Sequence, residues 1–120
     1  VDNKQVLWGI DLGGTKIEGV VLAYGDQPKV LERHSETTLL QVNLDTGLKN
    51  QIRVQLAEFG HPLVGDRHYA SDEINETLID RQALHSWKLT LNHPRNGKPV
   101  HFEADVPTDM RRVIDAYRKK

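Results

Sequence analysis

Apolar positions along the chain follow two periods, one of about two residues and one of about 3.6 residues. In the first pattern Leu40, Val42 and Leu44 alternate with polar residues, which predicts a strand with one buried face. Short runs rich in apolar or β-branched residues, bounded by glycine or proline turns, predict five more strands. The six expected strands are 6–11, 16–22, 29–34, 38–44, 84–91 and 99–104.

The second period predicts helices. Ile52, Leu56 and Phe59 recur at helical spacing and are expected in the core, and a glycine at position 60 ends this helix, near 49–60. A similar stripe predicts a helix near 108–118; its apolar positions are Met110, Val113, Ile114 and Tyr117. A serine at position 71 could cap a third, short helix within 71–80.

These elements predict an α+β fold with a mostly antiparallel sheet of about six strands and two or three helices. The helices near 49–60 and 108–118 are expected to cover one face of the sheet. The loop that follows the first helix carries its own apolar anchors: Leu63, Val64 and Tyr69.

Composition narrows the chemistry. The chain has 120 residues, 16 Lys and Arg, 17 Asp and Glu, six His and no Cys. That length suits one compact domain or about half of a common enzyme. The absence of Cys excludes disulfides, iron–sulfur clusters and thiol catalysis. The six His lack the spacing of a zinc helix, so we expect neither a metal nor a cofactor. No apolar run reaches the roughly 20 residues of a membrane span, and we expect a cytoplasmic chain with no membrane partner.

A glycine turn near the N-terminus is the first candidate site. Gly13 and Gly14 let backbone N–H groups approach an oxyanion, and Thr15 and Lys16 add donors. Asp11, at the end of the preceding strand, could face a metal-bound phosphate. These five residues form a candidate nucleotide-phosphate site. The alternative is a plain hairpin turn that joins two strands.

Residues 8–22, WGIDLGGTKIEGVVL, resemble the start of the ROK family of sugar kinases and regulators. In that family this hairpin is the first ATP-phosphate motif. The resemblance ends near residue 24. The family also needs a catalytic Asp in a Gly-Asn-Asp context and usually a His/Cys zinc site. This chain contains no Asn-Asp pair and no Cys.

A second constellation covers far more of the chain. It begins with TGLKNQIR at 46–53 and continues with GHPLVGDRHYA at 60–70; LHSWKL at 84–89 and NHP at 92–94 complete it. From about 29 to 110 the chain resembles the C-terminal half of RluA-type pseudouridine synthases. That resemblance implies isomerisation of uridine in ribosomal or transfer RNA, without a cofactor, on a base flipped into a pocket.

The resemblance also assigns roles. Arg53 would pair with the family's nucleophilic Asp, while Lys49, Asn50 and Gln51 would contact structured RNA together with Arg53. Leu48 departs from the Arg usual at that position, and no Arg-Leu-Asp triplet occurs. Arg53 is therefore expected to be a catalytic partner without its nucleophile, and autonomous enzyme activity is not expected.

The two resemblances together indicate a chimera with its join near 25–28. Residues 1–28 would be the kinase-like segment and 29–120 the synthase-like subdomain, packed as one unit. Three functions follow. The chain is an inactive synthase-derived domain with at most weak RNA binding, a scaffold that self-associates through an exposed sheet edge, or a nucleotide-phosphate binder.

Overall fold

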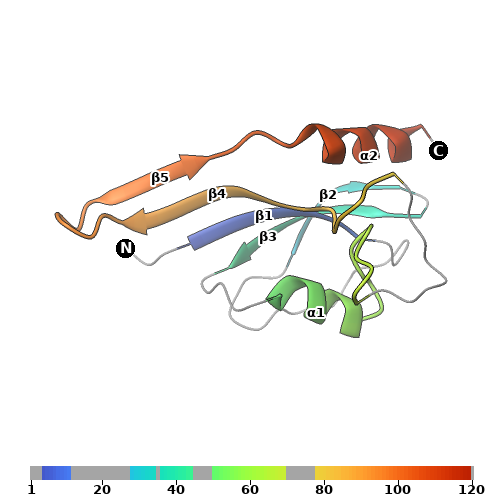
Figure 1. Cartoon of the computed structure of the whole chain (residues 1–120), viewed down its shortest axis with the longest axis horizontal. Helices are drawn as coiled ribbons and strands as arrows, with labels where there is room; N and C mark the ends of the chain where they lie inside the picture. The colour runs from blue at the N-terminus through green and yellow to red at the C-terminus, as the bar shows by residue number, and fades with distance from the viewer. Residues whose placement is uncertain (1–3, 12–27, 35, 45–49, 70–77, 120) are drawn as a thin grey trace.

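A computed structural model describes residues 4–11, 28–34, 36–44, 50–69 and 78–119 (Figure 1). They form five strands and two helices: β1 (Lys4–Asp11), β2 (Lys29–Arg33), β3 (Thr38–Leu44), α1 (Gln51–Glu58), β4 (Leu84–Asn92), β5 (Pro99–Glu103) and α2 (Thr108–Arg118). The α+β class is confirmed. The expected strand at 16–22 and most of the short helix expected within 71–80 lie outside the described residues.

All strand pairs are antiparallel, and the sheet order is β2-β3-β1-β4-β5. β1 occupies the centre, with Leu7 opposite Val42 of β3 and Ser86 of β4. The N-terminal strand therefore joins two pairs of strands that come later in the sequence. Among the described residues, β2 and β5 form the two edges of the sheet.

The two helices lie on opposite faces of the sheet, so the expectation that both cover one face was wrong (Figure 1). Successive strand residues point to opposite faces, and Leu40 packs with α1 while Leu39 packs with α2. Thr38, Leu39 and Leu40 are all buried, which requires cover on both faces at this end of β3.

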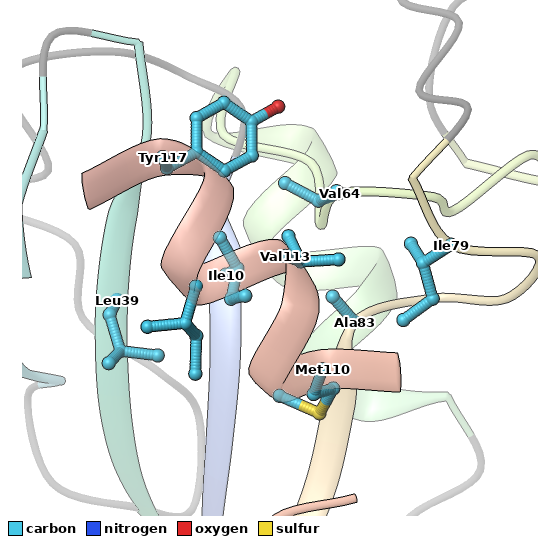
Figure 2. Close-up of a cluster of buried hydrophobic side chains, with 9 residues drawn as sticks. Ile10, Leu39, Val64, Ile79, Ala83, Met110, Val113 and Tyr117 are labelled. Carbon is cyan, nitrogen blue, oxygen red and sulfur yellow. The ribbon is translucent and has the colours of Figure 1, made fainter. Parts of the chain in front are cut away.

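The core on the α2 side gathers the apolar stripe of that helix. Figure 2 shows Met110, Val113 and Tyr117 against β1, β3 and the segment that leads into β4. All four predicted apolar positions of α2 are buried, as expected. The helix is anchored at its first turn, where both carboxylate oxygens of Asp109 accept hydrogen bonds from Arg81, at 2.9 and 3.0 Å.

The core on the α1 side confirms Ile52 and Leu56, which are 3% and 0% exposed. Phe59 was expected there and is instead 50% exposed. α1 ends at Glu58, and Gly60 then adopts a φ of 82°. Because the helix stops before Phe59, that residue leaves the buried stripe that its spacing predicted.

β4 and β5, which lie where two strands were expected, pair as an antiparallel hairpin. Figure 1 shows it running out to one end of the long axis, away from both helices. The ring nitrogen Nε2 of His85 lies 2.9 Å from the carbonyl oxygen of Ala104. This contact links β4 to the residue that follows β5.

Candidate functional site

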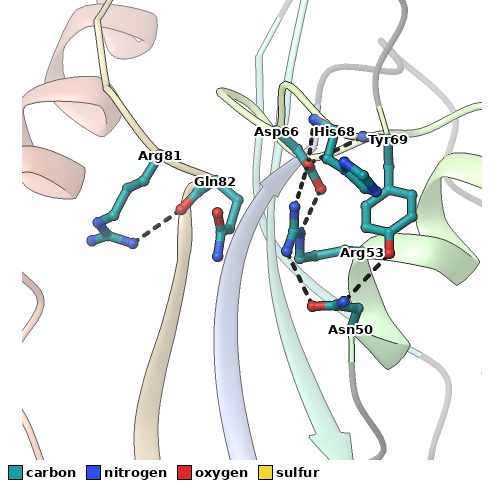
Figure 3. A network of polar contacts seen from close by, with 7 residues as sticks. All are labelled: Asn50, Arg53, Asp66, His68, Tyr69, Arg81 and Gln82. Carbon is teal, nitrogen blue, oxygen red and sulfur yellow. Dashed lines mark hydrogen bonds and ion pairs between the residues drawn. The ribbon is translucent and has the colours of Figure 1, made fainter.

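The start of α1 and the loop after it bring together the residues of the second constellation. Arg53, in the first turn of α1, donates from Nε to Oδ2 of Asp66 at 3.0 Å and from Nη2 to Oδ1 at 2.9 Å (Figure 3). This two-bond geometry matches a planar guanidinium to a planar carboxylate. The carboxylate partner of Arg53 among the described residues is therefore Asp66.

Asp66 is held from several directions. Its side chain is 0% exposed, and Oδ1 also accepts the backbone N–H groups of His68 and Tyr69, at 3.2 and 3.3 Å. Burial alone would raise the pKa of Asp66, but the bonds from Arg53 and from the two backbone groups hold it below its usual value. The hydrogen bond to Asp66 in turn raises the pKa of Arg53. Both groups are thus ionised at neutral pH.

Asn50 and Tyr69 complete the network. Nη1 of Arg53 donates to Oδ1 of Asn50 at 3.0 Å, and Nδ2 of Asn50 donates to the Tyr69 hydroxyl at 3.3 Å. The Tyr69 ring lies 4.9 Å from the Arg53 guanidinium carbon, within cation–π range. Asn50 precedes α1 with a φ of 56°, a left-handed conformation that Asn tolerates. The guanidinium is therefore fixed on three sides.

The loop that carries Asp66 is attached to the centre of the sheet. Val64 donates its N–H to the carbonyl of Ile10 at 2.7 Å and accepts the N–H of Ala83, also at 2.7 Å. Leu63 and Val64 are fully buried, which confirms both as anchors. Asp11 directly follows Ile10 and ends β1.

Gly65 allows the close approach of this loop to the segment before β4. Its φ is 76°, and a Cβ atom there would overlap the carbonyl oxygen of Arg81. Glycine is the residue that meets both conditions. The tight turn at Gly65 directs the next residue, Asp66, inward toward Arg53.

The other predicted site residues are distributed unevenly. Asn50 is half-buried, whereas Gln51 is 7% exposed and offers little surface to a ligand. Lys49 and the glycine-turn residues 13–16 lie outside the described residues. In the register of the sheet Asp11 stands opposite Thr38.

Sequence reasoning did not single out Asp66, which is the partner of Arg53. It also assigned Tyr69 to the core anchors, whereas Tyr69 belongs to the polar network. One signal was present: Asp66 comes directly after the apolar pair Leu63 and Val64 and a glycine. An acid next to such anchors is carried inward with them and needs a buried cation.

Within the described residues, His, Asp and Glu form no group of three or more that could hold a metal ion. Neither α1 nor α2 has the length and apolar character to cross a membrane.

Similarity to known proteins now adds to the geometry. No protein-family model matches the chain. Over 96 residues, three quarters of the chain, it is 41% identical to ribosomal large subunit pseudouridine synthase D of Nitrosomonas europaea. It is 36% identical to the synthase D of Neisseria meningitidis serogroup A, with 86% of the chain covered. The chain resembles the pseudouridine synthases. It spans 28% and 31% of the length of these two relatives.

The fold supports the same comparison. Human RNA pseudouridylate synthase domain containing 4 matches 97% of the chain with a TM-score of 0.74, and the chain covers 62% of that protein. At 16% sequence identity, this likeness concerns the fold. The pseudouridine synthase resemblance of the C-terminal part is thus supported twice. The kinase resemblance of residues 8–22 receives no support from these comparisons.

Proposed function

We propose that this chain is a pseudouridine-synthase-derived domain that contacts structured RNA and does not isomerise uridine by itself. The similarity to synthase D over three quarters of the chain carries the proposal. Ribosomal RNA is the first partner to test, because those relatives are named for the large ribosomal subunit. Transfer RNA is the second.

The state of Arg53 supports the inactive part of the proposal. Its guanidinium is already matched to Asp66, and that carboxylate accepts four hydrogen bonds while fully buried. A carboxylate so enclosed is a poor nucleophile, because hydrogen-bond donors surround it and its side chain is not exposed to a ligand. In this proposal Arg53 positions the loop, while Lys49 and Asn50 supply the contact with RNA.

An activity assay tests the catalytic part. The purified chain is incubated with large-subunit ribosomal RNA, and pseudouridine is mapped chemically. We expect no conversion, with the synthase D of Nitrosomonas europaea as the positive control. Conversion by the chain alone would contradict the proposal, and Asp11→Asn would then test whether the acid at the end of β1 acts as the nucleophile.

A binding assay tests the RNA-contact part. We expect salt-dependent binding of a structured RNA, weakened by Lys49→Gln but not by the control Lys119→Gln at the C-terminus. Arg53→Lys is the variant used to test Arg53 itself, because a lysine keeps a positive charge beside the buried carboxylate of Asp66 and so avoids unfolding the site. Absence of RNA binding, combined with dimer formation that depends on protein concentration, would favour the scaffold function instead.

The N-terminal segment carries a second, separate proposal. We propose that residues 1–28 derive from a ROK-type phosphate hairpin, because Asp11, the two glycines, Thr15 and Lys16 stand in the order of that motif. ATP would then raise the unfolding temperature, and Asp11→Ala would remove this effect. An unchanged unfolding temperature at millimolar ATP would contradict it.

A further inference from the structure

The β4–β5 hairpin differs in charge from the rest of the chain. From Arg81 to Phe102 there is no acidic residue, although the whole chain has 17. The same stretch has four cations and three His: Arg81, Lys88, Arg95, Lys98, His85, His93 and His101. Arg81 is bound to Asp109, and Lys88 stands opposite Glu103 in the register. Arg95 and Lys98 are left at the turn.

The turn itself is held firmly by its own groups. The backbone N–H of His93 donates a hydrogen bond to the carbonyl of Lys98 at 2.8 Å, and the N–H of Gly97 donates to the carbonyl of His93 at 2.9 Å. Side chains close the same turn: Nδ1 of His93 accepts the N–H of Arg95, and Oδ1 of Asn96 accepts the N–H of Lys98. Both cations are exposed, and neither has an acidic partner among the described residues.

The position of the turn suits contact with a large polyanion. β1 runs from the hairpin to the loop that carries Asp66, the partner of Arg53. At one end of β1 Lys4 pairs with Thr90, and near the other end the carbonyl of Ile10 accepts a hydrogen bond from the N–H of Val64. In Figure 1 the turn lies at the far end of the long axis, which measures 49 Å. On the same edge strand, but towards the end of β5 away from the turn, Phe102 exposes 55% of its surface. Exposed cations and an exposed aromatic side chain along one hairpin are features of surfaces that bind nucleic acid.

We propose that the β4–β5 turn is a second RNA contact, in which Arg95 and Lys98 bind backbone phosphates away from the Arg53 loop. This inference rests on the proposed function, because it takes RNA as the partner. A firm turn loses little conformational freedom on binding, so two cations there contribute more than two on a disordered tail. Contacts to phosphates position the RNA without reading its sequence.

The test measures binding of a fluorescently labelled stem–loop RNA with uridines in its loop, from 50 to 200 mM salt. Arg95→Gln/Lys98→Gln is expected to weaken binding on the order of tenfold and to lower the salt slope by about 2. The matched control is Arg111→Gln/Arg112→Gln, which removes the same charge from exposed positions of α2, on another part of the molecule. Circular dichroism checks that each variant is folded.

The outcomes separate the two proposals. A greater loss in the hairpin variant than in the α2 variant supports the inference. Equal losses in the two variants would overturn it, since only net charge would then matter, and RNA binding as such would stand. No binding by the unmodified chain would overturn both. Phe102→Ala adds a second readout: we expect weaker binding with an unchanged salt slope, because stacking releases no counterions.

Discussion

Two arginines of this protein each hold an aspartate by both carboxylate oxygens, and the two pairs differ in burial rather than in geometry. The bonds are 3.0 and 2.9 Å for Arg53–Asp66, and 2.9 and 3.0 Å for Arg81–Asp109. The side chains are 18% and 0% exposed in the first pair, but 38% and 36% in the second. Equal distances therefore do not mean equal energies, because water screens one pair and is excluded from the other.

The surroundings of the two pairs differ as well. Asp66 belongs to a closed network with Asn50 and Tyr69, which fixes the candidate site. The third guanidinium nitrogen of Arg81, Nη1, instead donates to the backbone carbonyls of Gln82 and Leu84, each at 3.0 Å. The first pair organises a site and the second fastens a helix to the start of β4.

The largest expected effect comes from Arg53→Ala. The substitution leaves Asp66 charged and buried, so we expect the free energy of unfolding to fall by about 3–5 kcal/mol. Removing one partner of the more exposed pair, in Asp109→Ala, should cost about 1 kcal/mol or less. Urea denaturation at pH 7 measures both. Similar losses would show that burial does not distinguish the pairs.

Gly65→Ala tests the turn that lies between the two pairs. A methyl group there meets the Arg81 carbonyl in a left-handed backbone, so we expect a loss of about 3 kcal/mol. Gly97→Ala is the matched control, because its φ of 68° is similar but nothing lies within 4 Å of the added atom. That control should lose about 1–2 kcal/mol. Equal losses would mean that backbone strain, not the close approach, sets the cost at Gly65.

The smallest expected effect is on the loss of folding stability at acidic pH. The pKa values of Asp66 and Asp109 both lie below their usual value, for Asp66 against the opposing effect of burial and for Asp109 mainly through the bonds from Arg81. Such groups stabilise the fold above the unfolded-state pKa of about 4, and this stability is lost as the pH falls through the folded-state value. We expect Asp66→Asn to flatten the decline in stability between about pH 5 and pH 3 more than Asp109→Asn does. Parallel curves for the two variants, measured by urea denaturation, would contradict this.

The sequence predicted elements best where the pattern was dense. β3 and α2 have the expected bounds, because alternation in one and four apolar positions in the other leave little choice of face. The opposite placement of the helices was not predicted, since the alternation of Leu40, Val42 and Leu44 was noted but the burial of Leu39, directly before them, was not. The predicted burial of Phe59 was wrong because the helical spacing continues in the sequence past Glu58, where α1 ends.

The candidate site was predicted as a place more successfully than as a set of contacts. The motif pointed to Arg53 and Asn50, which do lie together. Asp66 could not be paired with Arg53 from the sequence, because their contact depends on a loop folded back by Gly65 and anchored to β1. A contact set by such a turn leaves no periodic signal in the residues that make it.

Both neighbours of β1 in the sheet, β3 and β4, follow it in the sequence after other elements. During synthesis β1 can pair with β3 only after β2 and β3 have both been made. It can pair with β4 on its other edge only after α1 and the loop behind it have also been made. The central hydrogen-bond ladders therefore join distant parts of the sequence, an arrangement associated with slow folding. Until β4 is complete, one edge of β1 is open to wrong partners. This chain should consequently gain its stability in a single late step, and a version without residues 4–11 would lose the strand that joins β2–β3 to β4–β5.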